Sequence, residues 1–339
     1  MKRVLLTGAG GSIGVHTIAH IFHNTDWEIV AIDSFRHKGW CDRIVRVMQN
    51  HPDWSPRLTV LTHDMTAPFS PLLKKKIGHI DYIINMASLS DVQASIEDPV
   101  PFVRNNVDLV LNVLEYAREI KPEAFIQIST DEVYGASHRD QAHPEWSAIV
   151  PSNPYSASKA CQEALAISYW RTYNVPVVIT NTMNNFGEMQ QSSKYPAMLQ
   201  KWIKNGETVI IHGTEGDVGT RYYLHSRNHA DALVWILKNT KPYLHQPEAV
   251  DKPDRYNIVG DAQLSNLELA EIIARLMGKN LSFKYEMVDF HSTRPGHDKH
   301  YGLDGAKLKN LGWNPPLDFE SSLKNTIEWQ ERNPEWMEV

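Results

Sequence analysis

Four residues in the middle of the chain have side chains suited to moving protons. Asp131 and Glu132 are adjacent carboxylates, and Tyr155 and Lys159 are four residues apart. Spacing of four places two side chains on one face of a helix. A lysine ammonium group there can stabilise a phenolate and lower the pKa of the tyrosine, which is otherwise near ~10 and makes a poor base. These residue types suggest acid–base chemistry, although such a pair also arises by chance.

The position of these residues along the chain indicates that they belong to a ligand-binding site. Asp131 and Glu132 follow an expected strand at residues 125–129, and Tyr155 and Lys159 fall at the start of an expected helix at residues 156–173. In doubly wound sheets, ligands bind at the carboxyl ends of the strands. Two adjacent carboxylates are usually a solvated turn, but at a strand end beside a tyrosine they are candidates for an acid and a base.

A glycine-rich turn occupies residues 7–14 (TGAGGSIG), between an expected strand at 4–6 and an expected helix at 12–23. Glycine lets the backbone approach a pyrophosphate, and the helix start offers N–H groups to it. Asp33 follows 19 residues after Gly14, where a carboxylate can accept ribose hydroxyls and would repel a 2′-phosphate. The pattern predicts NAD rather than NADP, the alternative being a structural turn without a nucleotide. The residues expected at the phosphates are Gly8, Gly11, Ser12, Ile13 and Gly14.

The remaining pattern predicts an α/β fold. Short runs rich in Val and Ile alternate with helix-length segments, which is typical of a doubly wound parallel sheet of the Rossmann type. We expect residues 1–182 to form the NAD-binding domain, with 222–240 packing back on it. Residues 183–221 and 241–339 would form a smaller mixed α/β domain for a nucleotide sugar, and 240–255 reads as an exposed connection.

Composition excludes several classes of protein. The 339 residues carry a net charge of -6, which argues against nucleic-acid binding. No apolar run approaches the ~20 residues of a membrane span. The chain has two cysteines, Cys41 and Cys161, so we expect neither a disulfide framework nor a cysteine zinc site. Together these features predict a cytoplasmic protein.

Five motifs carry a family resemblance that runs nearly end to end: residues 129–135 (STDEVYG), 151–160 (PSNPYSASKA), 184–187 (NNFG), 256–258 (YNI) and 294–298 (RPGHD). The chain resembles the extended short-chain dehydrogenases/reductases, the NAD-dependent epimerase/dehydratase family, and among them the dTDP-glucose 4,6-dehydratases. The glycine turn and the Tyr-x-x-x-Lys pair are common to the superfamily. The Thr-Asp-Glu triple and the Arg-Pro-Gly-His-Asp segment are far more specific.

The resemblance implies an internal redox elimination on a nucleotide-diphospho-hexose. Tyr155 would take the proton of the 4-hydroxyl while NAD accepts the C4 hydride, and Thr130 would hydrogen-bond the 4-oxygen. Glu132 would remove the C5 proton and Asp131 would protonate the departing 6-hydroxyl. The hydride would return to C6, giving a 4-keto-6-deoxy sugar. Further cofactor contacts implied by the resemblance are Asp64, Met65, Ala87 and Asn106, besides Tyr155 and Lys159.

The diphosphate of such a substrate needs local cations, because the net charge supplies none. The candidates are the cations Lys194, Arg221, Arg294 and His297, and the amides Asn185 and Asn257. His297 and His300 could be imagined as a metal pair, but their spacing is loose and no acid cluster supports it, so no metal is expected.

Two segments depart from the family pattern. Residues 88–94 (SLSDVQA) replace the usual hexose segment, and the loop at 213–223 is longer and ends in Tyr222 and Tyr223. The hexose and the nucleotide, dTDP or UDP, therefore stay open. A nucleotide-sugar 4-epimerase or decarboxylase and a non-catalytic NAD-binding module are the competing interpretations. The family resemblance also implies a homodimer that pairs the helix after Val100 with the helix carrying Lys159.

Overall fold

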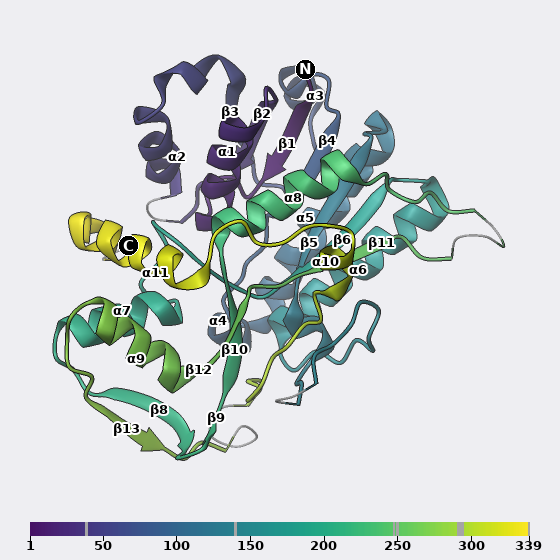
Figure 1. Cartoon of the computed structure of the whole chain (residues 1–339). Helices are drawn as coiled ribbons and strands as arrows, with labels where there is room; N and C mark the ends of the chain where they lie inside the picture. The colour runs from purple at the N-terminus through teal and green to yellow at the C-terminus, as the bar shows by residue number, and fades with distance from the viewer. Residues whose placement is uncertain (38–39, 139–140, 247, 249–250, 290–294, 338–339) are drawn as a thin grey trace.

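A parallel sheet forms the centre of the molecule (Figure 1). The computed structural model describes residues 1–37, 40–138, 141–246, 248, 251–289 and 295–337. Within these residues the sheet has seven strands in the order β11-β6-β5-β4-β1-β2-β3. The strands are β1 (Arg3–Thr7), β2 (Glu28–Asp33), β3 (Leu58–Thr62), β4 (Tyr82–Asn85), β5 (Ala124–Thr130), β6 (Val177–Thr182) and β11 (Asp254–Ile258).

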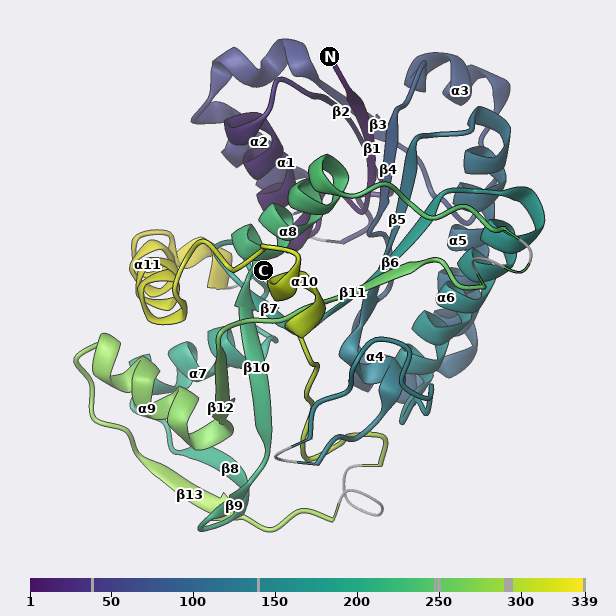
Figure 2. The ribbon, with the colours of Figure 1, turned by 45° about the vertical axis from the view of Figure 1, so that its right-hand side comes forward.

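Helices cover both faces of this sheet, which is why its central strands β4, β5 and β6 are buried along their whole length. Successive side chains of β1 alternate between the faces. Val4 and Leu6 belong to a core with Ile18, whereas Leu5 belongs to a separate core with Val110. Figures 1 and 2 show the two layers. One contains α1 (Ser12–Asn24), α2 (Trp40–Gln49) and α8 (Ser226–Asn239), and the other contains α3 (Pro71–Ile77), α5 (Pro99–Ile120) and α6 (Pro154–Tyr173).

A smaller mixed α/β layer lies beyond the carboxyl ends of the central strands (Figure 2). Its two sheets are β12-β10-β7, with β12 (Ala262–Ser265), β10 (Thr220–His225) and β7 (Asn184–Phe186), and β13-β8-β9, with β13 (Phe283–Glu286), β8 (Val209–Thr214) and β9 (Asp217–Val218). The helices near them are α7 (Tyr195–Lys204), α9 (Asn266–Leu276) and α11 (Phe319–Arg332), whereas α10 (Ala306–Asn310) packs against β11 of the central sheet. Leu199, Ile273 and Leu323 are among the residues of its core.

Short elements complete the described chain. They are α4 (Val92–Glu97) and the 3-10 helices η1 (Pro52–Arg57), η2 (Asp131–Tyr134) and η3 (Pro334–Met337). None of the helices in the described ranges is long and apolar enough to cross a bilayer.

The predicted parallel doubly wound sheet is confirmed. One expected segment is wrong: residues 254 and 255 are not part of an exposed connection but open the buried strand β11. Arg255 made this segment read as exposed, because a charged side chain is rarely buried unless it is paired. In the structure Arg255 is buried and paired with Glu163. Strand β11 falls in the range expected for the second domain although it pairs with β6, and the division into domains stays a prediction.

Candidate active site

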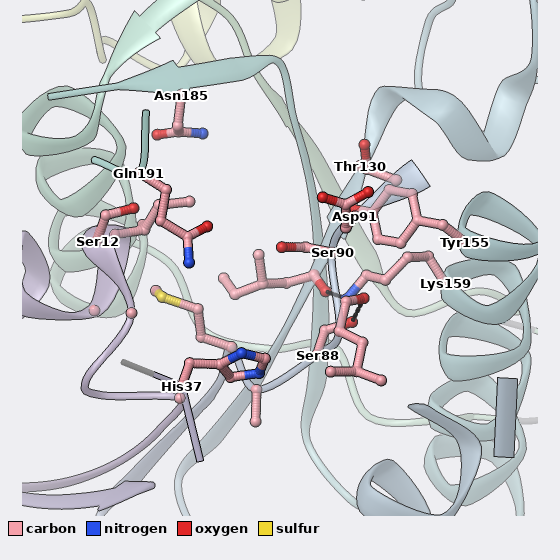
Figure 3. Close-up of a pocket in the computed structure, with 18 of the residues that line it drawn as sticks. Ser12, His37, Ser88, Ser90, Asp91, Thr130, Tyr155, Lys159, Asn185 and Gln191 are labelled. Atoms are coloured by element: carbon pink, nitrogen blue, oxygen red, sulfur yellow. Dashed lines mark hydrogen bonds between the residues drawn. The ribbon is translucent and has the colours of Figure 1, made fainter. Parts of the chain in front are cut away.

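One cavity of about 590 Å³ runs along the carboxyl ends of the central strands. Its lining includes the glycine turn at one end and residues 130–132, Tyr155 and Lys159 at the other. Figure 3 shows Ser12, His37 and Gln191 on one side, facing Tyr155, Lys159 and Thr130 on the other. The structure therefore brings together the predicted cofactor turn and the predicted acid–base residues.

The glycines of the turn let backbone segments pack closely against one another. A Cβ atom on Gly14 would lie 2.5 Å from the carbonyl oxygen of Gly8, and Gly8 itself has φ +69°. Asp33 at the end of β2 is buried, and its carboxylate accepts hydrogen bonds from the backbone N–H groups of Gly10 (2.9 Å) and Phe35 (2.9 Å). Burial raises the pKa of Asp33 above its ordinary value, and these two hydrogen bonds oppose the rise.

Most of the other predicted cofactor residues also line the cavity, namely Gly11, Ser12, Ile13, Asp64, Met65 and Ala87. Asn106 is buried and is not among the described residues of the lining. Its amide accepts from the backbone N–H of Leu89 (2.8 Å) and donates to the carbonyl oxygen of Leu89 (3.0 Å) and to Ser158 Oγ (2.8 Å). Asn106 thus holds the segment after β4 against helix α6.

Helix α6 presents Tyr155 and Lys159 to the cavity. The helix starts with Pro154, and Asn153 caps it in a capping box with Ser156. The Lys159 ammonium group donates hydrogen bonds to the carbonyl oxygen of Ile128 (2.7 Å) and to Gln162 Oε1 (2.6 Å). Burial lowers the pKa of Lys159 to about 7, and the charge of Glu163 opposes the fall.

The expectation that Lys159 lowers the pKa of Tyr155 is wrong for this structure. Burial and the neighbouring carboxylate of Glu132 raise the pKa of Tyr155 well above its ordinary value, while a hydrogen bond with Thr130 opposes the rise. The physical reason is the direction of the lysine, whose ammonium group is directed to Ile128 and Gln162. A phenolate at Tyr155 would therefore need a further positive charge beside it, such as that of bound NAD.

Asp131 and Glu132 lie in η2, directly after β5. Thr130 Oγ1 donates to Asp131 Oδ1 at 2.8 Å, and Asn153 Nδ2 donates to Glu132 Oε2 at 3.1 Å. Burial raises the pKa of Asp131 to about 6. Burial, together with the charge of Asp131, raises the pKa of Glu132 to about 7. Near neutral pH the pair can therefore hold one proton, as an acid and a base acting together require.

The predicted substrate residues do not all reach the cavity. Asn185, Lys194 and His297 line it. Arg221 and Asn257 are not among its described lining residues. The guanidinium of Arg221 donates to the backbone carbonyl oxygens of residues 220, 298 and 299 and lies 4.3 Å from the ring centre of Tyr301. Arg294 lies outside the described residues.

Asn257 is likewise engaged with the protein, because its amide donates to the carbonyl oxygens of His143 (3.0 Å) and Asp304 (3.0 Å). Among the described residues no cluster of His, Cys, Asp or Glu is arranged to hold a metal ion. The site therefore consists of acid–base side chains and a nucleotide-sized cavity.

Comparison with known proteins places this site in a family. The model of the family described as GDP-mannose 4,6 dehydratase matches residues 5–326. The chain belongs to the GDP-mannose 4,6-dehydratase family. It is 32% identical to the low-salt glycan biosynthesis protein Agl12 of Haloferax volcanii, over 96% of this chain and 97% of that protein.

Solved structures with the same fold include the dTDP-glucose 4,6-dehydratase DesIV of Streptomyces venezuelae, with NAD and TYD bound. It has a TM-score of 0.85 and 28% identity, and the alignment covers 99% of each chain. UDP-glucuronic acid 4-epimerase of Bacillus cereus also shares the fold, with a TM-score of 0.84 and 24% identity over 98% of this chain and 99% of that chain. The fold alone therefore does not separate the two activities.

Two lining residues of this member of the family were not predicted from the sequence. Arg43 of α2 is buried and donates to the backbone carbonyl oxygens of Met189 (3.0 Å) and Gly10 (3.2 Å). Asp91 caps helix α4 and lines the cavity in the segment that departs from the family pattern. The departure from the family pattern could have identified Asp91 as a lining residue. An arginine in an amphipathic helix is common, so nothing in the sequence pointed to Arg43.

Proposed function

We propose that the chain is an NAD-dependent sugar-nucleotide 4,6-dehydratase that converts a nucleotide-diphospho-hexose to its 4-keto-6-deoxy form. One observation carries the proposal: Asp131 and Glu132 share a cavity with Tyr155 and Lys159. Proton abstraction at Tyr155 alone would serve an epimerase. The two carboxyl groups supply the additional acid and base that loss of water needs.

The residues present fit NAD. The glycine turn leads into the start of α1, where backbone N–H groups at the cavity would hold a pyrophosphate, and the buried Asp33 suits the ribose hydroxyls rather than a 2′-phosphate. Asp64, Met65 and Ala87 line the same end of the cavity. When bound, NAD supplies a hydride acceptor for C4 and a hydride donor for C6.

The side chains of this chain would then move the protons. Tyr155 takes the proton of the 4-hydroxyl, and Thr130 hydrogen-bonds the 4-oxygen. The resulting ketone acidifies the C5 proton, which Glu132 removes while Asp131 protonates the leaving 6-hydroxyl. Burial raises the pKa of both carboxyl groups, so either can hold the proton that the pair shares. The assignment of the two roles rests on the family resemblance.

The substrate proposed first is dTDP-glucose. Lys194 and His297 lie in the cavity where a diphosphate would need cations, and Asn185 offers an amide there. The roles of Arg221, Arg294 and Asn257 in substrate binding stay predictions. Tyr222 and Tyr223, which depart from the family pattern, belong to β10 and are not among the described residues that line the cavity, so dTDP as the nucleotide stays a prediction.

A substrate screen tests this function directly. The purified protein is incubated with dTDP-glucose, UDP-glucose, GDP-mannose and CDP-glucose in D₂O, and the products are analysed by NMR and mass spectrometry. We expect a 4-keto-6-deoxy product with solvent deuterium at C5 and the C4 hydrogen transferred to C6. Inversion at C4 without loss of water would show a 4-epimerase instead, and no turnover with any hexose would favour a binding module.

We also propose a homodimer in the cytoplasm. Helices α5 and α6 pack side by side on one face of the sheet (Figure 2). They expose apolar side chains, Val100 and Leu111 on α5 and Tyr173 on α6. A second copy of the same helix pair would cover these side chains. Light scattering during size-exclusion chromatography tests the proposal, and a monomeric mass at micromolar concentration would contradict it.

A further inference from the structure

Glu163 lies outside the cavity but contacts the residues that hold its acid–base turn. It is on α6, one helical turn after Lys159, and its side chain is 0% exposed, like that of Arg255. Glu163 Oε2 accepts a hydrogen bond from Arg255 Nη2 at 2.7 Å. The other oxygen, Oε1, accepts from Asn181 Nδ2 at 2.8 Å. Both oxygens of one buried carboxylate are therefore engaged.

These two partners reach the two ends of η2, the turn that carries Asp131 and Glu132. Asn181 Nδ2 also donates to the carbonyl oxygen of Thr130, the residue before the turn, at 3.0 Å. Arg255 Nη1 donates to the hydroxyl of Tyr134, the last residue of the turn, at 2.9 Å. One carboxylate on the helix of Tyr155 and Lys159 thus connects to both ends of the turn.

Stability alone does not explain a fully buried ion pair. The cost of removing both charges from water is often as large as their attraction, and well-packed apolar residues serve equally well. Arg255 is also stacked 4.2 Å from the ring centre of Trp146, so its pocket is already lined by aromatic surface. The arrangement is better explained by what the pair holds in place.

We propose that Glu163 is a positioning residue that keeps the Asp131–Glu132 turn in register with Tyr155 and Lys159. The proposal rests on the proposed function, because it assigns the turn and the lysine their roles in dehydration. Glu163 is not among the described residues that line the cavity, so it acts through the groups it holds.

The surroundings of Lys159 make its protonation depend on Glu163. From β5 the lysine meets the neutral carbonyl oxygen of Ile128, and from its own helix it meets the neutral amide of Gln162. Asp131, Glu132 and Tyr155 line the same cavity, and Arg255 lies on the far side of Glu163. Of these groups, Glu163 is the one whose charge raises the pKa of Lys159 against the effect of burial.

The first test is Glu163→Gln, which keeps the shape of the side chain and removes its charge. Two quantities are measured in the NAD-loaded protein: the pH above which C4 oxidation slows in single turnover, and hydrogen exchange of the amides at residues 130–134. The midpoint of this loss of C4 oxidation with rising pH is called the pH midpoint. Because the lysine loses its negative neighbour, we expect the pH midpoint to fall by about one unit or more. Exchange at residues 130–134 should become faster.

Glu188→Gln is the matched control. Glu188 is also buried and paired with an arginine, Arg227, but it lies in the segment after β7, away from the turn. This variant should lose stability without moving the pH midpoint or the exchange at residues 130–134. If it produces the same changes as Glu163→Gln, the effect is general destabilisation and the proposal is overturned.

Asn181→Val is a second variant that leaves no unpaired charge. Valine suits strand β6 and leaves the Glu163–Arg255 pair intact. It removes the hydrogen bonds of Asn181 with the carbonyl oxygen of Thr130, with Glu163 Oε1 and with the Tyr134 hydroxyl. We expect faster exchange at residues 130–134, an unchanged pH midpoint, and dehydration slower by roughly 10–100-fold because the turn is misplaced.

The outcomes separate this inference from the proposed function. If the wild type forms product but Glu163→Gln and Asn181→Val match it in pH midpoint and exchange, the inference is overturned. If the wild type forms no product, the proposed function fails. Hydrogen exchange and an NMR titration of Lys159 in labelled protein then still decide whether Glu163 holds the turn and the charge. If Glu163→Gln is too unstable to purify, Asn181→Val and the Lys159 titration in the wild type decide the inference.

Discussion

The ammonium group of Lys159 donates a hydrogen bond to the backbone carbonyl oxygen of Ile128 at 2.7 Å. This contact ties helix α6 to the carboxyl end of β5, where Thr130 begins the acid–base segment. The lysine that is expected to assist Tyr155 makes this contact with a buried charge, and burial of that charge lowers the stability of the fold. Replacing Lys159 with an uncharged residue should raise the unfolding temperature and abolish turnover, which is the first prediction.

Lys159→Met should stabilise the fold and abolish turnover. The pKa of Lys159 falls from 10.5 to about 7 on folding, so the unfolded chain binds more protons and burial of the charge is penalised. The penalty is greatest at low pH and disappears as the pH rises from about 7 to 10.5. We expect an unfolding temperature higher by roughly 2–4 °C at pH 6, with a smaller difference at pH 9. Calorimetry at the two pH values checks this, and a lower unfolding temperature at pH 6 would contradict it.

Tyr155→Phe should prevent the first oxidation while leaving the cofactor bound. Phenylalanine keeps the half-buried ring and removes the oxygen that accepts the proton. Loss of a general base typically costs ~10²–10⁴-fold in the step it serves. The test is the absorbance of NADH after substrate is added to NAD-loaded protein. Oxidation at a near wild-type rate would show that Tyr155 is not the base.

Glu132→Gln and Asp131→Asn should separate oxidation from loss of water. Each amide is nearly isosteric with its carboxyl group but cannot exchange the proton. Oxidation at C4 relies on Tyr155, so bound NADH should accumulate while dehydration slows by ~10²–10⁴-fold. Deuterium incorporation at C5 distinguishes the roles: if Glu132 is the base, exchange at C5 persists in Asp131→Asn and is lost in Glu132→Gln. If exchange at C5 is instead lost in Asp131→Asn and persists in Glu132→Gln, then Asp131 is the base and Glu132 the acid.

Asp91→Asn should change the choice of hexose. Asp91 Oδ1 accepts from the backbone N–H of Ala94 at 3.0 Å, and asparagine preserves this helix cap while removing the charge from the cavity. We expect KM for a neutral hexose to rise by roughly 3–10-fold as a charged hydrogen bond is lost. Inhibition by a nucleotide-diphospho-hexuronate should strengthen, because its carboxylate meets less repulsion. Glu97→Gln, at the exposed end of the same helix, is the control that should change neither quantity.

Local sequence rules predicted much of the fold and part of the site. The glycine spacing and Asp33 identified the cofactor end because both depend on short-range backbone geometry. Helix α6 starts two residues before the predicted boundary, since Pro154 is tolerated in a first turn, and β6 starts after Pro176, which has no N–H to donate. Arg221 shows the limit: its partners are carbonyl oxygens 77 and 78 residues away, and only the folded chain reveals that they occupy the guanidinium.

Strand β11 has a consequence for the order in which the protein can be made. On a ribosome, β6 is complete at residue 182, but the strand that pairs with it begins at residue 254. Until then the fully buried strand β6 is the edge of the sheet, and Glu163 is without Arg255. A nascent chain of residues 1–182 is therefore expected to stay incompletely folded and prone to associate, although it contains the glycine turn, Asp33 and every proposed acid–base residue. The central sheet would therefore be complete only after β11 has been synthesised.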